Sequence, residues 1–124
     1  MLSRSLQITA RYFEFVAYST GAESIIICDS VNRRPQAHAN IIPGLQGKSI
    51  ISVAQGHNHY AARTIDGKVY TWGRSFDGAL GLGGVGQYEE RVETPTQVKF
   101  DGKELFCIAI TAGREHTAAL VLDL

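Results

Sequence analysis

The stretch Ile51-Ser-Val-Ala-Gln-Gly56-His-Asn-His59-Tyr-Ala-Ala returns later in the chain as Ile108-Ala-Ile-Thr-Ala-Gly113-Arg-Glu-His116-Thr-Ala-Ala. Gly113 follows Gly56 by 57 residues, and His116 follows His59 by the same 57. Self-similarity at a fixed period is the signature of a fold built from successive similar units. The repetition therefore decides the fold before any single element is considered.

A weaker third copy lies upstream of these two. The segment from Ile8 to Ile27 overlays Ser52 to Thr71 at an offset of 44 residues, without the repeat's glycines. At this offset Cys28-Asp29 stands in place of Trp72-Gly73. We expect this copy to form a degenerate version of the same unit.

Four short strands are predicted within one unit. Two β-prone runs flank the Asp-Gly pair in Tyr60-Ala-Ala-Arg-Thr-Ile-Asp66-Gly67-Lys-Val-Tyr-Thr-Trp72, which predicts a hairpin with a type I′ turn. Residues Ser49 to Ala54 supply a preceding strand, and Thr96 to Phe100 a closing one. Four short antiparallel strands per unit are typical of a propeller blade.

The prediction is an all-β fold, a partial β-propeller with about two recognisable four-stranded blades and a degenerate one. We place the degenerate blade at 8–48, a full repeat at 49–105 and the start of the next repeat at 106–124. Thirteen glycines in 124 residues exceed the usual share of about 7%. Tight turns between short strands explain the excess.

The repeat positions are interpreted as structural. Gly56 and Gly113 are expected to permit a sharp entry to the second strand, and Trp72 to act as an apolar wedge between blades. His59 and His116 are expected to satisfy buried backbone groups beside the glycine turn. The remaining positions belong to the hairpin turn and the glycine-rich loop: Asp66, Gly67, Gly73, Gly78, Leu80, Gly81 and Gly83.

Composition narrows the function classes. Twelve Lys and Arg balance twelve Asp and Glu, so the net charge is zero and no strongly basic nucleic-acid-binding tail is present in these residues. The two cysteines, Cys28 and Cys107, lie far apart and suggest neither a disulfide framework nor a zinc site. No secretory leader or membrane span is predicted. We expect a soluble protein of the cytoplasm, the nucleus or both.

Motifs for chemistry are weak. Gly81-Leu-Gly-Gly-Val-Gly86 satisfies G-x-G-x-x-G, but the acidic, proline-broken segment after it does not predict a phosphate-binding helix. On a strand, His57 and His59 would share a face and could reach one zinc ion, yet only His59 recurs. Ser75 and Cys107 lack a nucleophile elbow. We predict no enzyme activity, no cofactor and no metal site.

The aromatic side chains Trp72, Tyr70 and Tyr60 suggest a stacking platform for nucleic-acid bases as an alternative to a core. Such a platform requires interleaved Lys and Arg on the same face, and only Lys68 and Arg74 are nearby. We therefore expect these aromatics to pack between blades.

The motifs together resemble the regulator of chromosome condensation repeat. They are Gly56-His-Asn-His-Tyr-Ala-Ala, Asp66-Gly-Lys-Val-Tyr-Thr-Trp-Gly, Asp77-Gly-Ala-Leu-Gly-Leu-Gly, Thr94-Pro, and Ala112-Gly-Arg-Glu-His-Thr-Ala-Ala-Leu. The resemblance covers Ser49 to about Leu122 well. It implies a propeller of about seven blades, of which this chain supplies a part.

Within this family, three segments look like the C-terminal end of fungal F-box proteins of the SCF-associated factor type: Ile41 to Ala54, Phe106 to Gly113, and the end from Ala118 to Leu124. The resemblance implies a protein-binding propeller that holds the substrate of a cullin-type ubiquitin ligase. The alternative that the family implies is a guanine-nucleotide exchange factor for a Ran-type GTPase. A truncated product without function is the third possibility.

Partner contacts are expected in the loop region from Ser75 to Glu93, because loops at the rim of a propeller are where partners bind. Its candidate contact residues are Ser75, Tyr88, Glu89, Glu90 and Arg91. The run from Tyr88 to Glu93 is expected to be a solvated loop. Since too few blades are present to close a ring, the missing ones are expected to come from a longer parent chain or from self-association.

Overall fold

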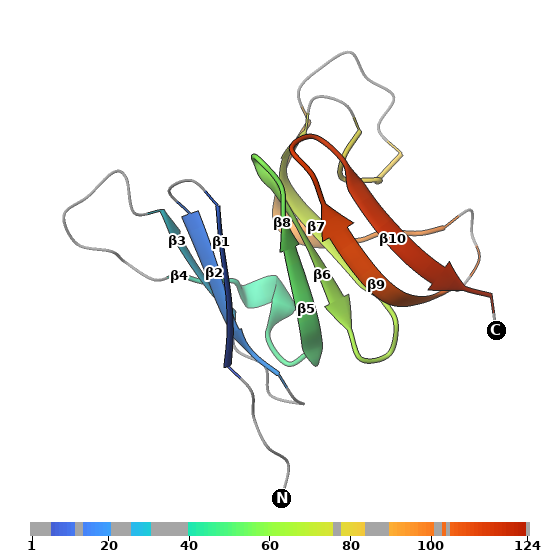
Figure 1. The fold of residues 1–124 in the computed structure, drawn as a ribbon, viewed down its shortest axis with the longest axis horizontal. Coiled ribbons are helices and arrows are strands. Elements are labelled where there is room, and N and C mark those ends of the chain that lie inside the picture. Colours follow the sequence, from blue (N-terminus) through green and yellow to red (C-terminus); the bar gives the residue numbers. More distant parts are fainter. Residues whose placement is uncertain are drawn as a thin grey trace, which may run out of the picture.

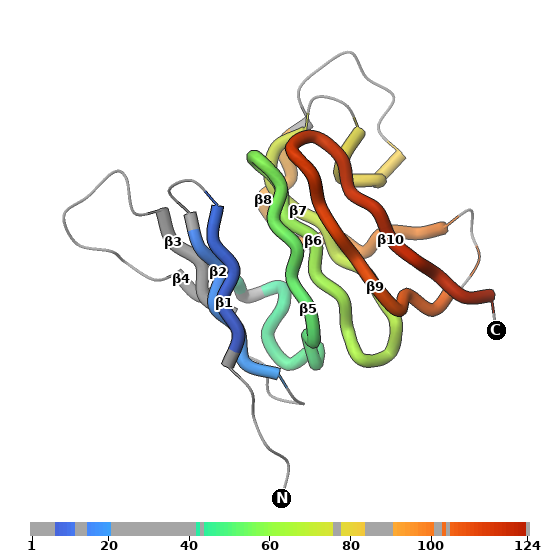
Figure 2. Tube along the Cα trace, in the orientation of Figure 1, coloured from blue at the N-terminus to red at the C-terminus, as the bar shows by residue number. Residues whose placement is uncertain are grey.

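Three antiparallel sheets follow one another along the chain (Figure 1). The computed structural model describes residues 6–11, 14–20, 26–30, 40–75, 78–83, 90–100, 103 and 105–123. Figure 2 shows the second sheet between the first sheet and the terminal hairpin. Small antiparallel sheets that pack on one another in chain order are typical of consecutive propeller blades, so the all-β propeller prediction is confirmed.

The sheets contain four, four and two strands. The first blade comprises β1 (Leu6–Arg11), β2 (Glu14–Ser19), β3 (Ile26–Ser30) and β4 (Asn40–Ile41). After the 3-10 helix η1 (Pro43–Leu45), the second blade comprises β5 (Ile50–Gln55), β6 (His59–Thr64), β7 (Val69–Ser75) and β8 (Glu90–Gln97). The terminal hairpin comprises β9 (Phe106–Ala112) and β10 (Thr117–Leu122).

The 57-residue period is present in the strand register. Val53 pairs with Ala62 in the second blade, and Ile110 pairs with Ala119 in the terminal hairpin. Even the irregularity recurs, since both hairpins shift register beside an equivalent residue, Ile51 in one and Ile108 in the other. The second blade and the terminal hairpin are therefore two copies of one structure.

The offset of 44 predicted for the first copy is wrong. Ile8 pairs with Ala17 as Val53 pairs with Ala62, which gives an offset of 45 over the first two strands. On the third strand Asp29, not Cys28, takes the register position of Trp72. An error of one residue matters because it moves every side chain to the opposite face of the sheet.

The hairpin between β6 and β7 forms, but with a different turn from the predicted type I′. Only Gly67 has a positive φ, of +81°, whereas type I′ requires positive φ at both central residues. The Gly67 amide donates to the Thr64 carbonyl at 3.0 Å, and the Thr64 amide to the Lys68 carbonyl at 2.9 Å. The loop therefore has three residues, ending in one left-handed glycine.

The segment expected to be a solvated loop is largely a strand. Residues from Glu90 onward form β8, and Pro95 lies inside it. Proline and charged side chains are tolerated because β8 is the outer strand of its sheet among the described strands. The register with β7 also shifts beside Trp72, which accommodates the proline. The predicted closing strand at Thr96 to Phe100 accordingly ends early, at Gln97.

The main core lies between the first and second blades. Trp72 is 6% exposed and packs in one cluster with Val16 and Tyr18 of β2. The Tyr60 ring stacks on Trp72 with centroids 5.3 Å apart. The aromatic side chains thus lie between blades as expected, instead of forming an exposed platform for bases.

Candidate interaction surface

The Gly-x-x-His motif is a stack of an imidazole on a glycine. A Cβ on Gly56 would lie within 2.6 Å of three atoms of the His59 ring, and a Cβ on Gly113 within 2.7 Å of three atoms of the His116 ring. Neither glycine has a positive φ. The glycines are therefore needed to make room for the ring, and not for the backbone conformation that the sequence suggested.

His59 connects the second blade to the terminal hairpin. Its ring is 1% exposed, and Nε2 lies 3.2 Å from the His116 carbonyl oxygen and 2.9 Å from Thr117 Oγ1. Since a carbonyl can only accept, Nε2 carries the hydrogen of a neutral ring. Burial lowers the pKa of His59 below its usual value, which favours the same neutral state. The histidine does satisfy a backbone group, but one in the next unit.

His116 occupies the same position in the terminal hairpin and is exposed. The amide of Gly113 donates to the His116 carbonyl at 2.9 Å, as that of Gly56 does to His59 at 2.8 Å. The local fold of the motif is therefore identical in both copies. What differs is the environment of the ring, because no described sheet packs beyond the terminal hairpin.

Two further glycines lie at close contacts, Gly73 with the turn before β6 and Gly67 with the terminal hairpin. A Cβ on Gly73, whose φ is +108°, would lie 2.5 Å from the Asn58 carbonyl oxygen. A Cβ on Gly67 would lie 2.5 Å from the Phe106 ring. The Cys107 amide also donates to the Gly67 carbonyl at 2.9 Å. Gly67 is thus both a turn residue and a contact to the hairpin, which the sequence did not reveal.

Asp66 contributes to the same turn from the surface. The Thr64 hydroxyl donates to its carboxylate, and this hydrogen bond lowers the pKa of Asp66. The Lys68 ammonium lies 3.5 Å from the carboxylate. Both charged side chains are exposed, so their ion pair contributes little to stability beyond helping to order the turn.

The start of the glycine-rich loop is fixed by two hydroxyl groups. The Thr71 hydroxyl donates to the Leu80 carbonyl at 2.7 Å, and the Ala79 amide donates to Ser75 Oγ at 2.7 Å. Ser75 is 4% exposed, so it does not present its side chain to a partner as predicted. Its hydroxyl instead holds the loop, in which Gly78, Gly81 and Gly83 have positive φ.

Among the predicted contact residues, the structure describes only part of the set. Tyr88 and Glu89, like Phe76 and Asp77, lie outside the described residues, and the side chain of Glu90 is also outside them. Arg91 is exposed on β8, where it pairs across the sheet with Arg74. The structure therefore places Arg91 on the surface, one register position from Ser75, whose side chain is buried.

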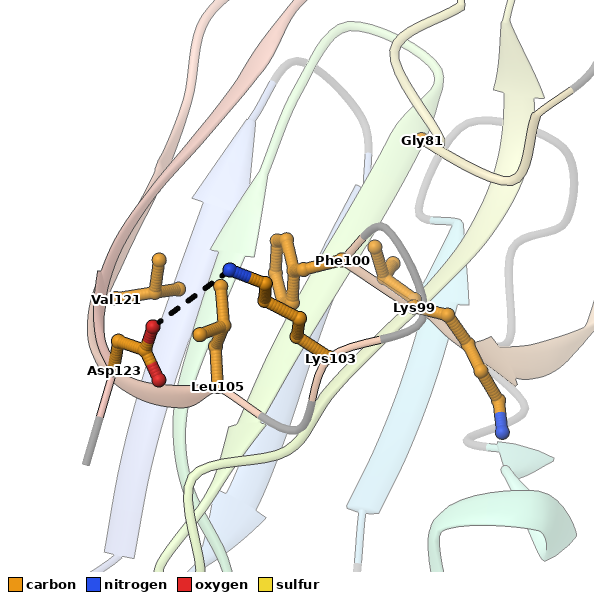
Figure 3. A pocket seen from close by; sticks show the side chains of 8 residues that line it. Gly81, Lys99, Phe100, Lys103, Leu105, Val121 and Asp123 are labelled. Carbon is orange, nitrogen blue, oxygen red and sulfur yellow. Dashed lines mark ion pairs between the residues drawn. The ribbon is translucent and has the colours of Figure 1, made fainter.

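A hollow of about 550 Å³ lies between the end of β10 and the segment that follows β8 (Figure 3). Its apolar lining comes from Val98, Phe100, Leu105 and Val121. The Lys103 ammonium reaches across it to Asp123 at 3.9 Å, and both groups are exposed.

The candidate chemical groups are not assembled into a site. His57 lies in the turn before β6, so it does not share a strand face with His59. Burial raises the pKa of the Cys107 thiol, which disfavours the reactive thiolate. No cluster of three or more metal-ligating side chains occurs among the described residues. Within the same residues, no helix has the length and apolar character needed to cross a membrane.

Comparison with protein families gives the assignment. Two models of the regulator of chromosome condensation (RCC1) repeat match residues 66–120 and 50–79, and together they span more than half of the chain. The chain belongs to the RCC1 repeat family. The histidine stack, the hairpin turn and the glycine-rich loop described above are thus parts of an RCC1 repeat.

Relatives within the RCC1 family include the Ultraviolet-B receptor UVR8 of Arabidopsis thaliana, 39% identical over 83 residues, covering 66% of this chain and 18% of UVR8. SCF-associated factor 1 of Saccharomyces cerevisiae is 36% identical over 90 residues, covering 60% of this chain and 14% of that protein. The chain spans less than a fifth of the length of either relative.

The crystal structure of Prp20p from Saccharomyces cerevisiae superposes with a TM-score of 0.74. The superposition covers 98% of this chain and 32% of Prp20p, at 18% identity. Prp20p is described together with its binding to Gsp1p and histones. At this level of identity, the similarity shows a shared RCC1 propeller fold.

Proposed function

We propose that this chain is a protein-interaction module, the substrate-binding propeller region of an F-box subunit of a cullin-type ubiquitin ligase. The observation that carries the proposal is the 36% identity to SCF-associated factor 1. We also propose a location in the cytoplasm, the nucleus or both, in keeping with a free buried thiol at Cys107.

The side-chain chemistry of the RCC1 repeat supports a binding role. Two buried polar side chains of the second blade are engaged inside the fold: His59 bonds at the junction with the hairpin, and Thr71 bonds under the loop. What remains for a partner is the region around the glycine-rich loop and the outer strand β8, where Arg91 and Glu93 are exposed. Loops on a rigid scaffold are common sites of recognition.

A first experiment determines which domains the parent protein has. The transcript is sequenced from its true 5′ end, and the tagged endogenous protein is purified for mass spectrometry. An in-frame F-box, together with co-purification of a cullin and its adaptor, is the expected result. Absence of both from a fully sequenced transcript and a purified complex would overturn the ubiquitin-ligase proposal.

A second experiment separates the rival activity and tests the surface. The purified protein is incubated with a Ran-type GTPase loaded with fluorescent GDP, and accelerated release would favour nucleotide exchange over substrate binding. In the ligase complex, Arg91→Glu is expected to reduce the capture of substrate proteins. Lys99→Glu, the same charge reversal at an exposed position beyond β8, is the matched control and should leave capture unchanged.

A further inference from the structure

The described arginines and lysines are separated along the direction of the strands. We define the loop end as the end with the β5–β6 turn, the β9–β10 turn and the start of the glycine-rich loop, and the turn end as the end with the β6–β7 turn (Figure 1). The His57 amide donates to the Arg114 carbonyl at 3.0 Å, which joins two turns of the loop end. The arginines of the loop end are Arg11, Arg74, Arg91 and Arg114, and the lysines of the turn end are Lys48, Lys68, Lys99 and Lys103. Arg63, the remaining described arginine, lies within β6.

The two kinds of cation differ in how they bind anions. An arginine guanidinium is planar, is weakly hydrated and bonds a carboxylate through two parallel N–H donors, whereas a lysine ammonium is a strongly hydrated point charge. At the turn end, the Lys68 ammonium lies 3.5 Å from the Asp66 carboxylate, which offsets its charge. Lys103 lies 3.9 Å from Asp123 in the same way. The loop end therefore has the side chains that are better suited to an anionic partner.

Two of the loop-end arginines are direct neighbours across the sheet. Arg74, near the end of β7, pairs in register with Arg91, near the start of β8, so both side chains lie on one face. Like charges directly opposite each other on a sheet are destabilising. A bound carboxylate between the two guanidinium groups would remove this repulsion. Both strands belong to the second blade, which packs on a described sheet on each side.

The backbone that carries this arginine pair is held in place. The Arg74 amide donates to the Asn58 carbonyl at 2.7 Å. The next residue, Ser75, is buried, and its hydroxyl oxygen accepts a hydrogen bond from the Ala79 amide at 2.7 Å. Arg91 is exposed and Arg74 is half-buried. Because the strands are ordered before a partner arrives, binding costs less conformational entropy than at a mobile segment.

Arginines of the two neighbouring sheets lie at the same end. Arg114 is exposed in the β9–β10 turn, and it lines a small hollow together with Arg74. Arg11 ends β1 of the first blade. Burial and, to a lesser extent, the charge of Arg11 lower the pKa of His59, so this guanidinium lies near the start of β6. The loop end thus presents guanidinium groups from three consecutive sheets.

We propose that the loop end binds an acidic segment of a partner protein, with aspartate or glutamate carboxylates bound between Arg74 and Arg91. The inference rests on the proposed function, since it names the chemical class of substrate that the propeller captures. Carboxylates fit better than phosphate groups, because the exposed Glu93 and Glu115 lie within two residues of arginines in the sequence and repel a dianion more strongly than a single charge. Nucleic acid fits less well, because the chain has no net charge.

The test measures the fluorescence anisotropy of a short labelled peptide that alternates glutamate and serine, mixed with the purified full-length protein. We expect saturable binding that weakens as salt is added, and no binding of the matched peptide with glutamine in place of glutamate. Arg74→Gln and Arg91→Gln should each weaken binding about fivefold, which is typical of one exposed ion pair. Lys99→Gln is the matched control, since Lys99 is exposed at the turn end, and it should bind like the unmodified protein.

Charge reversal is the decisive measurement. A variant with both Arg74→Glu and Arg91→Glu should lose the glutamate peptide and gain binding of a peptide that alternates lysine and serine. Circular dichroism confirms that each variant is folded, and Arg91→Glu alone serves as a second variant should the double variant not fold. Unchanged affinity of the Arg74→Gln and Arg91→Gln variants would overturn the proposal. So would tighter binding of a phosphoserine peptide or of single-stranded RNA than of the glutamate peptide.

The assay separates this inference from the proposed function. It contains neither a cullin nor its adaptor, so a protein without a ligase role still binds the glutamate peptide if the loop end recognises carboxylates. Conversely, a ligase complex that captures substrates while the purified protein does not bind the glutamate peptide would retain the proposed function and overturn the inference of an acidic segment.

Discussion

Gly56→Ala and Gly113→Ala make the same chemical change at equivalent repeat positions, yet the structure predicts opposite outcomes. In both cases the new methyl group would overlap the imidazole ring three residues later. The ring of His59 is buried and bonded to the terminal hairpin, whereas that of His116 is exposed. The first ring cannot move away without breaking the junction, but the second can rotate into solvent.

The cost of Gly56→Ala follows from what the displaced ring leaves behind. The two contacts of His59 Nε2 contribute about 1 kcal/mol each, while the His116 carbonyl keeps the hydrogen bond from the Gly113 amide. We therefore expect a loss of about 2 kcal/mol in the free energy of unfolding, which lowers the melting temperature of a chain of this size by about 8 °C. Gly113→Ala should lie within about 1 kcal/mol of the unmodified chain.

The assay is urea unfolding followed by circular dichroism, with a double-mutant cycle. In the background of His59→Ala, no ring stands over Gly56, so the further substitution Gly56→Ala should cost almost nothing. Equal destabilisation by Gly56→Ala and Gly113→Ala would refute the reasoning. An undiminished cost of Gly56→Ala in the His59→Ala background would show that the glycine is needed for another reason.

Three further predictions concern the same blade. Thr71→Val leaves the buried Leu80 carbonyl without its hydroxyl donor and should lower the free energy of unfolding by about 1–3 kcal/mol in urea. Thr96→Val removes an exposed hydroxyl contact and should be near neutral. Equal effects of the two substitutions would contradict a structural role for the Thr71 hydrogen bond. Gly67→Ala should destabilise the chain more than Gly47→Ala. Both glycines have positive φ, but only at Gly67 would the new methyl group overlap a side chain, the Phe106 ring. Equal melting temperatures of the two variants in calorimetry would exclude this ring contact. Since burial lowers the pKa of His59 in the folded state, its contribution to stability is complete above about pH 6.5 and is lost as the pH falls toward the folded pKa; His59→Gln should remove this part of the pH dependence of unfolding.

Much of the second blade could be predicted from sequence because its period and its hairpin are local signals. The 57-residue spacing of Gly56 and Gly113 reappears as strand register, and the Asp-Gly pair does mark a turn. The turn type was not predictable from that pair alone. Asp-Gly suits both a type I′ turn and a three-residue loop ending in a left-handed glycine, and the choice depends on which residues pair across the strands.

The errors have a common physical origin in strand pairing. The first copy has lost the glycines and the tryptophan that fix the alignment, so its sequence predicts a register that is one residue out. The charges and Pro95 of β8 predict a loop because they oppose strand formation in general, but not at an outer edge. Whether a strand is outermost is a property of the sheet, and it cannot be seen in the strand's own sequence.

The contacts described for the candidate surface could not be predicted from the sequence, for a different reason. The partner of the His59 ring includes Thr117, and the corresponding position in the second blade is Tyr60, so the contact leaves no repeated residue as a signal. The packing of Phe106 over Gly67 also leaves no repeated sequence signal, because it joins residues from different units. A sequence repeat reveals the residues that successive units have in common, whereas the contacts between units are made by residues that differ from one unit to the next.

The distinction between recurring and non-recurring residues also bears on which residues are available for binding a partner. Residues that recur, such as Gly56 and His59, hold one unit to the next and would be required whatever the protein binds. The first blade has Glu14 where the second has His59 and still packs against its neighbour through Val16 and Tyr18, so even the junction tolerates substitution where apolar contacts replace polar ones. Under the proposed function, we therefore expect partner recognition to rest on residues that the repeat does not constrain, such as those around the glycine-rich loop and along β8.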